Sequence, residues 1–244
     1  MRIGAVIALL TTLLVTSAAC GGGGLFREYE YEEEMYLALD GSATIYVNAS
    51  IPVLNALRGA AFSEDPSAGI DREGLTAFFT APGLEVTRLT QSRRNGRRFA
   101  HVRLDAESVN TLASTKPFAW STYKYGQDGE LYVYQQEVGA SSSGALRATD
   151  WSGDELVAFR MHLPSTIVYH NAGPGNPRRG NILVWEQPLT ARLKGDPLAL
   201  DARFESQSIL SRTLLLFAAT VVAVALMFVA IIWWVVRRGR ERPA

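Results

Sequence analysis

The residues that most often carry catalysis or bind metals are scattered through this sequence. The three histidines are His101, His162 and His170, and none belongs to an H-E-x-x-H motif or has the i,i+4 helical partner that would present a metal ion. No G-x-S-x-G motif marks a serine nucleophile, and Cys20 is the single cysteine of the chain. The sequence therefore predicts no metal site, no cofactor site and no catalytic residue. On strands, the histidines are expected to be half-buried surface groups.

Acidic residues are the remaining candidates for chemistry. Asp150, Asp154 and Glu155 precede a predicted strand, and two carboxyl groups about 5 to 10 Å apart in a cleft would allow glycoside hydrolysis. The sequence does not give that separation, so a hydrolase with an unrecognised carboxylate pair remains a third interpretation. The segment Gly173 to Pro177 is rich in glycine, but its prolines lack the amide donors of a phosphate-binding loop, so we predict a connector.

Four arginines crowd the tip of one predicted hairpin: Arg93, Arg94, Arg97 and Arg98. They flank Asn95-Gly96, a pair that tolerates the positive φ of a type I′ turn. A basic side chain near an anionic membrane surface contributes about 1 kcal/mol to binding, so these arginines are candidates for contact with lipid headgroups. The alternative is that they keep an exposed turn soluble.

A second predicted hairpin concentrates aromatic side chains: Trp120, Tyr123, Tyr125, Tyr132 and Tyr134. Because side chains alternate along a strand, Trp120 falls on one face and Tyr123 and Tyr125 on the other. One aromatic face would then be open to an amphipathic ligand. Ordinary cross-strand packing is the alternative.

The N-terminal segment has the pattern of an export signal. Arg2 precedes the apolar run Ile3 to Val15, which is too short to span a membrane comfortably, and small residues then lead to Cys20. We predict a signal peptide over residues 1–19 and a glycine-rich tether over 20–26. Ala18-Ala19-Cys20 is similar to the lipobox of bacterial lipoproteins, which implies lipid attachment at Cys20. Because Ser17 stands where Leu or Val is usual, cleavage after Ala19 by the ordinary signal peptidase is the alternative.

The C-terminal segment is predicted to cross a membrane. Leu214 to Val236 is an uncharged run of about 23 residues, long enough for a hydrocarbon core of about 30 Å. It ends in two tryptophans, which favour the headgroup region, and in the basic residues Arg237, Arg238, Arg240 and Arg242. We expect a transmembrane helix over residues 213–236 and a basic cytoplasmic tail over 237–244. The chain would be a single-pass protein of the bacterial cytoplasmic membrane, with its domain on the extracytoplasmic side.

The composition gives no indication of a nucleic-acid partner and excludes stabilisation by disulfides or by zinc bound to several cysteines. The chain has 24 basic and 24 acidic residues and no dense basic tract, so nothing in its charge indicates nucleic acid. A single cysteine excludes an internal disulfide and zinc sites built on several thiolates. The stability of the exported domain must come from packing.

Between the two ends, residues 27–206 predict one α+β domain, with a mostly antiparallel sheet and a few short helices on one face. Strands are expected on either side of Asn95-Gly96 and of Asp128-Gly129, and in further alternating segments up to residue 205. Short helices are expected to begin after Ser50, after Asp71 and at Asp105. In the opening strand, tyrosines alternate with glutamates, and Glu33-Glu34 is expected to face solvent.

The order of these elements resembles the LppM-type bacterial lipoproteins. A lipobox-like cysteine, a strand with Asp40-Gly41, paired short helices, a sheet, the strand Asn181 to Trp185, a Leu-rich strand and a membrane helix with an Arg tail follow one another. The resemblance spans nearly the whole chain. It implies a membrane-tethered envelope domain, with binding of lipid or glycolipid proposed for some members, and it carries over no ligand residues.

These observations favour a non-enzymatic envelope protein that binds or senses a lipid-like, amphipathic molecule beside the membrane. Its expected partners are the membrane and a lipid or glycolipid, and not nucleic acid. The alternative is an accessory subunit that docks on another membrane or envelope protein. An apolar cavity of ligand size would distinguish the first interpretation from the second.

Overall fold

The computed structural model describes residues 29–141, 151–176 and 180–240. The strands in these ranges are β1 (Tyr29–Leu37), β2 (Ala43–Ser50), β3 (Leu84–Arg94), β4 (Arg97–Ala106), β5 (Ser121–Asp128), β6 (Leu131–Val138), β7 (Leu156–His162), β8 (Ser165–His170), β9 (Ile182–Pro188) and β10 (Leu198–Ser208). The helices are α2 (Ile51–Arg58), α3 (Arg72–Phe79), the 3₁₀ helix η1 (Val109–Ser114), α4 (Leu189–Lys194) and α5 (Ile209–Arg240).

The strands form two sheets. A six-stranded sheet has the order β3-β4-β2-β1-β7-β9, and a four-stranded sheet has the order β5-β6-β10-β8. All pairs are antiparallel except β1 with β7, which run parallel. The predicted α+β class with mainly antiparallel strands is confirmed, but the strands divide into two sheets where one was expected. Period-two alternation gives the phase of a strand and does not say which strands are neighbours.

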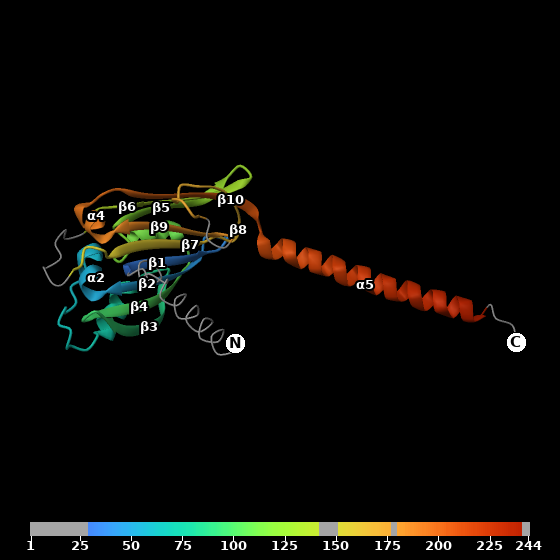
Figure 1. Ribbon diagram of the computed structural model, residues 1–244, viewed down its shortest axis with the longest axis horizontal. Helices are drawn as coiled ribbons and strands as arrows, with labels where there is room; N and C mark the ends of the chain where they lie inside the picture. The colour runs from blue at the N-terminus through green and yellow to red at the C-terminus, as the bar shows by residue number, and fades with distance from the viewer. Residues whose placement is uncertain (1–28, 142–150, 177–179, 241–244) are drawn as a thin grey trace, which may run out of the picture.

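The two sheets share one hydrophobic core. Figure 1 shows the strands of the six-stranded sheet one below another, with β5, β6 and β10 above them. Met35, Ile45 and Phe159 of the six-stranded sheet are buried in the same cluster as Tyr134 and Phe204 of the four-stranded sheet. Each sheet therefore buries one apolar face against the other and leaves a polar face outside.

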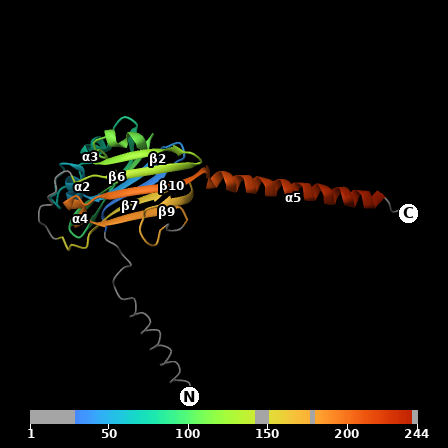
Figure 2. The same ribbon diagram turned by 90° about the horizontal axis from the view of Figure 1, so that it is seen from above.

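The domain has two distinct ends. In both views α2 and α4 lie at one end, here called the distal end, and α5 leaves from the opposite end (Figures 1 and 2). Ser50 directly precedes α2 and pairs with Phe99, so the β3–β4 hairpin tip lies at the distal end. The start of β1 lies there too, because Tyr31 pairs with Ala49.

Local sequence signals placed most turns and caps correctly. Asn95 and Gly96 have φ values of 50° and 71°, as the predicted type I′ turn requires. Asp71 accepts a hydrogen bond from the backbone N–H of Gly74 at 2.8 Å and so caps α3. Helix α2 begins directly after Ser50, although the Ser50 side chain makes no capping hydrogen bond.

The third predicted helix begins later than expected. Asp105 is not its start but a residue of β4, where it accepts a hydrogen bond from the Thr44 hydroxyl at 2.9 Å. The 3₁₀ helix begins at Val109, and Val109 and Leu112 are buried. Alternation that continues to Ala106 outweighs the capping tendency of an aspartate. Helix α4 was not predicted; Gly195, with φ of 83°, ends it.

Two asparagine side chains bind backbone groups on one edge strand of each sheet. Asn110 donates to the carbonyl of Tyr125 at 2.9 Å and accepts from its N–H at 2.7 Å, on the edge strand β5. Asn176 likewise donates to the carbonyl of Val184 at 3.1 Å and accepts from its N–H at 2.9 Å, on the edge strand β9. A side-chain amide thus replaces a neighbouring strand and satisfies backbone groups that would otherwise be free to pair with another chain.

Glu33 is buried between the sheets, although the sequence predicted that it would face solvent. It is 2% exposed because it shares the inner face of β1 with Tyr31 and Met35. Its Oε2 lies 2.5 Å from Nη2 of Arg58, which is 4% exposed, and accepts a hydrogen bond from the Tyr31 hydroxyl at 3.0 Å. Here an ion pair occupies a position where an apolar residue is usual.

Aromatic rings and protein dipoles surround this ion pair. The Arg58 guanidinium lies 4.6 to 4.8 Å from the ring centroids of Tyr31, Phe118 and Trp120 and donates to the carbonyl of Pro117. Burial raises the pKa of Glu33 to about 8, although a hydrogen bond from Gln136 opposes part of this rise. Burial likewise lowers the pKa of Arg58 to about 9. The close contact between the two groups favours their charged forms and opposes both shifts.

We predict that Arg58→Met destabilises the domain by about 3 to 5 kcal/mol at pH 8, because it leaves the Glu33 carboxylate buried without its counter-charge. Burial holds the folded-state pKa of Glu33 above the unfolded value, at about 8. A group shifted upward contributes stability that is present at low pH and is lost as the pH rises through the folded-state pKa. The variant should therefore recover stability between pH 8 and pH 5, measured by thermal unfolding of the full chain in detergent.

The control is the double variant Glu33→Gln/Arg58→Met, in which no titrating carboxyl remains between the sheets. The difference between its melting temperature and that of wild type should not become smaller between pH 8 and pH 5. Equal pH dependence in the single and double variants would contradict the assignment of the recovery to Glu33.

Candidate functional site

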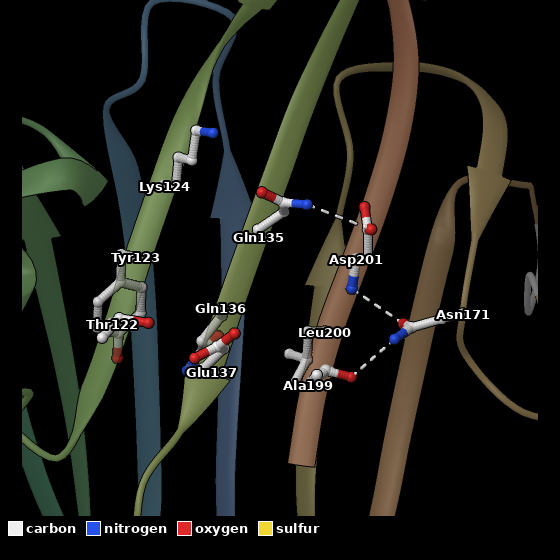
Figure 3. A pocket seen from close by; sticks show the side chains of 10 residues that line it. All are labelled: Thr122, Tyr123, Lys124, Gln135, Gln136, Glu137, Asn171, Ala199, Leu200 and Asp201. Carbon is white, nitrogen blue, oxygen red and sulfur yellow. Dashed lines mark hydrogen bonds between the residues drawn. The ribbon is translucent and has the colours of Figure 1, made fainter. Parts of the chain in front are cut away.

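The outer face of the four-stranded sheet carries a groove with a volume of about 380 Å³. Figure 3 shows the side chains that line it, which come from β5, β6, β10 and the residue after β8. They are Thr122, Tyr123, Lys124, Gln135, Gln136, Glu137, Asn171, Ala199, Leu200 and Asp201. The exposed members are mainly polar, because the apolar residues of these strands point to the inner face.

Asn171 holds one wall of this groove. Its Oδ1 accepts from the backbone N–H of Asp201 at 2.9 Å, and its Nδ2 donates to the carbonyl of Ala199 at 2.9 Å (Figure 3). The same Oδ1 also accepts from Nε1 of Trp185 at 2.8 Å. On the other side, Gln135 Nε2 lies 3.4 Å from Asp201 Oδ2. Lys124 and Glu137 remain exposed. The groove therefore offers both signs of charge on a fixed backbone.

The groove also brings two carboxylates together. Asp201 pairs with Gln135, so Glu137 is diagonal to Asp201 across β6 and β10. Diagonal neighbours on an antiparallel sheet lie about 7 to 8 Å apart. The acids considered from sequence are elsewhere: Asp154 is exposed, and Glu155 is buried directly before β7. Asp150 lies outside the described residues.

The outer face of the six-stranded sheet has a smaller cavity, of about 200 Å³. It is lined by Tyr29, Glu32, Asn48, Ser92, Arg94, Phe99 and His101. His101 lies 2.7 Å from the Ser92 hydroxyl through Nε2 and 3.0 Å from Asn48 Oδ1 through Nδ1. Partial burial and the nearby Arg94 charge lower the pKa of His101 below its ordinary value of 6.5.

The other two histidines lie elsewhere. His162 Nε2 is 2.6 Å from Glu34 Oε1, and its ring stacks on Tyr36 with centroids 3.9 Å apart. His170 ends β8 in the four-stranded sheet. Within the ranges that the structure describes, no three His, Cys, Asp or Glu side chains gather as a metal site would require.

The hairpin arginines do not form one basic surface. Arg97 Nη2 lies 2.9 Å and Arg94 Nη2 3.2 Å from Oε1 of the buried Glu30. Arg98 is 5% exposed and donates to the carbonyl of Gly69 at 2.7 Å and to that of Ser63. Arg93 is exposed at the tip, which lies at the distal end, away from α5. Headgroup contact stays a prediction, but three of the four side chains already bind within the protein.

The aromatic hairpin has no open aromatic face. Tyr123 and Tyr134 are buried, and Tyr125 and Tyr132 stack on each other and on Phe204 with centroids 5.4 to 6.3 Å apart. Trp120, at the start of this hairpin, packs on Tyr31 and Phe159 of the six-stranded sheet. Cross-strand and intersheet packing is thus the correct interpretation of these residues.

Helix α5 is long and apolar enough to cross a membrane. The candidate span is Thr213–Arg238, with 26 residues and a mean hydropathy of 2.9, and none of its apolar window is buried in the protein. Arg237 lies over the ring of Trp233 and Arg238 over that of Trp234, so the aromatic and basic residues lie together at its C-terminal end. The predicted signal peptide, the tether and Cys20 lie outside the described residues.

The sequence matches no family model and no curated protein. Among solved structures, the chain is similar in fold to the folded domain of the Mycobacterium tuberculosis LppM protein, determined by NMR. The TM-score is 0.41 at 11% sequence identity, over 76% of this chain and 95% of that chain. A likeness of this degree says nothing about ligand or activity.

Sequence reasoning singled out His101 and Arg94 of the smaller cavity and Tyr123 of the groove, but missed the residues that lie beside them. Alternation places Gln135 and Glu137 on one face of β6, and Asp201 on one face of β10, but it does not make the two strands neighbours. Ser92 and Asn48 are ordinary residues in their own strands. Only the pairing of β4 with both β2 and β3 brings them to His101.

We predict that Arg98→Lys loosens the segment between Ser63 and Gly69, because a lysine ammonium cannot reproduce the fork that binds both carbonyls. Limited proteolysis of the full chain should cut this segment faster than in wild type. Arg93→Lys is the matched control, since Arg93 pairs with Arg98 across the hairpin but is exposed. Equal cleavage of the two variants would argue against this role of Arg98.

Proposed function

We propose that this chain is a membrane-anchored bacterial envelope protein whose domain binds or senses the polar head of a lipid-like, amphipathic molecule. The observation that carries the proposal is a spanning-length helix, unburied in the protein, that continues directly from the last strand of a folded domain. A spanning helix is an effectively permanent anchor. The domain is thereby kept within tens of ångströms of the bilayer, where amphipathic ligands are concentrated.

The groove on the four-stranded sheet supports recognition of a head rather than of an acyl chain. Its exposed lining combines the Lys124 ammonium, the Glu137 and Asp201 carboxylates and the Thr122 hydroxyl. Such groups fit a charged or hydroxyl-bearing ligand, whereas an acyl chain requires an apolar cavity. The inner faces of the two sheets are filled by their own side chains.

We base the proposed orientation across the membrane on the arginines at the C-terminal end of α5. Positive charge near the end of a spanning helix favours the cytoplasmic side, so the domain would lie outside the cytoplasm and lipid on Cys20 would hold its other end. Lipid attachment of Cys20 is an additional part of this proposal, and loss of lipid labelling in Cys20→Ala would support it.

We predict that protease added to intact spheroplasts cleaves the domain and leaves the basic tail, residues 237–244, protected. The segments on either side of residues 142–150 and the exposed Asp65-Pro66-Ser67 turn are suitable cleavage positions, and a C-terminal epitope reports the protected end. Cleavage only after permeabilisation would contradict the proposed topology.

We predict that Lys124→Glu reduces the lipid-like molecules that co-purify with the full chain from its native membranes, measured by mass spectrometry. The reversal of charge changes the exposed wall of the groove without touching the core. The matched control is Lys116→Glu, an exposed lysine that does not line the groove. If both variants retain the same molecules in the same amounts as wild type, the proposal that these molecules bind in this groove is wrong.

A second candidate function is docking on another envelope protein. The edge strand β8 exposes Val168 by 57% and Tyr169 by 48%, beside the strand that leads into α5. A free strand edge with apolar side chains can accept a strand from a partner. Recovery of a stoichiometric protein in the purification above, lost in Val168→Asp, would favour this function.

A further inference from the structure

Three side chains on adjacent strands of the six-stranded sheet have the contacts of a nucleophile, a base and a group that orients the base. Ser92 on β3 lies 2.7 Å from His101 Nε2 on β4. His101 Nδ1 lies 3.0 Å from Oδ1 of Asn48 on β2. Both distances are within hydrogen-bond reach, which is the geometric requirement for a hydroxyl activated by an imidazole.

The hydrogen-bond chain fixes which nitrogen of His101 carries the proton. Asn48 Nδ2 donates to Glu32 Oε2 at 3.3 Å, and Glu32 is held in turn by Arg160 Nε at 2.9 Å. The Asn48 oxygen is therefore the atom that faces His101, and it can only accept. Nδ1 of His101 then donates, and its Nε2 presents a lone pair to the Ser92 hydroxyl.

The surroundings keep this imidazole neutral at pH 7. Partial burial and the positive charge of Arg94 lower the pKa of His101. Besides His101, the charged side chains that line the cavity are Glu32 and Arg94. Glu32 on β1 forms an ion pair with Arg160 on β7. A neutral imidazole is the form that accepts a proton as general base.

We infer that Ser92 is the nucleophile and His101 the general base of an ester-hydrolysing site, with Asn48 as a positioning residue. The site lies on the opposite sheet from the groove assigned to ligand binding, so it goes beyond the proposed function and does not depend on it. The arrangement of roles is one that recurs on unrelated folds, where geometry rather than chain order identifies it.

The cavity beside Ser92 defines the class of substrate. Its volume of about 200 Å³ suits a small carboxylic ester, and Phe99 and Tyr29 supply an aromatic wall. Arg94 lines the same cavity, with its guanidinium 4.5 Å from the Phe99 ring centroid. Its fixed positive charge is the group available to stabilise the oxyanion that forms at the attacked carbonyl.

The reaction proceeds in two balanced halves. Ser92 Oγ bonds to the ester carbonyl carbon while its proton passes to His101 Nε2; the tetrahedral intermediate then breaks the bond to the alkoxy oxygen, which takes that proton and leaves as the alcohol. In the second half, water gives a proton to His101 and its oxygen bonds to the acyl carbon. The bond to Ser92 Oγ breaks, the proton returns to the serine, and a carboxylic acid is released.

The test uses the purified full chain in detergent, with p-nitrophenyl acetate as substrate and a fluorophosphonate as covalent probe. We expect slow hydrolysis and a single adduct, which peptide mass spectrometry places on Ser92. Ser92→Ala should lose the adduct and the hydrolysis, and His101→Gln should slow hydrolysis roughly 100-fold or more. Ser67→Ala is the control, an exposed serine whose hydroxyl binds Asp65 instead of a histidine, and it should behave as wild type.

A second variant separates positioning by Asn48 from a merely structural role. Asn48→Asp puts a carboxylate against Nδ1–H and raises the pKa of His101, so the acidic limb of the pH–rate profile should move to higher pH while activity persists. Asn48→Ala should lower kcat with little change in KM. All variants are compared by thermal unfolding, since the substituted side chains are on the outer face.

Two results would overturn the inference: a wild-type chain that acquires no adduct at Ser92, or a Ser92→Ala variant that hydrolyses the ester as fast as wild type. An acidic limb that stays in place in Asn48→Asp would overturn the role of Asn48. None of these outcomes changes the lipids retained by Lys116→Glu or lost by Lys124→Glu, so failure here and failure of the proposed binding function are distinguishable.

Discussion

The contact between Glu33 and Arg58 is the constraint on which the arrangement of the domain depends. Glu33 belongs to β1, one of the two central strands of the six-stranded sheet, and Arg58 is the last residue of α2. The carbonyl that Arg58 binds precedes β5, and the amide that meets Glu33 is on β6. Each ion would cost several kcal/mol if it were buried without its partner. Any packing that moves one layer relative to the others separates these groups, so such packings are disfavoured.

This interior leaves the two outer faces free to be polar. Most apolar side chains of both sheets pack between them, as the stack of Tyr125, Tyr132 and Phe204 illustrates. The outer faces then carry charged and amide groups whose backbone positions are fixed by the ladders below them. A rigid sheet is a better support for a site than a loop, because it holds its side chains within small tolerances. The groove on one face and the Ser92–His101–Asn48 chain on the other both have this support.

Features set by neighbouring residues in the chain could be predicted from the sequence, and features set by distant strands could not. Asn95-Gly96 and Asp71 act within four residues, so the hairpin and the cap of α3 follow from local chemistry. The phase of β1 does not follow, because its run of glutamates gives no sign that Glu33 meets an arginine 25 residues later. The candidate sites are even harder to predict from the sequence, because Asn48 and His101 are separated by 53 residues. Arg94, Arg97 and Arg98 looked like a solvent-facing cluster because their partners are equally remote.

The opposite exits of the first strand and of α5 determine how the domain responds to force. The described chain starts beside α2 and leaves at the other end, along the direction of the strands (Figures 1 and 2). Tension applied between these two exits would therefore act along the strands. In that direction the ladder hydrogen bonds of β1, with β2 on one side and β7 on the other, share the load in shear instead of opening one after another. This arrangement resists tension that is applied between the two exits.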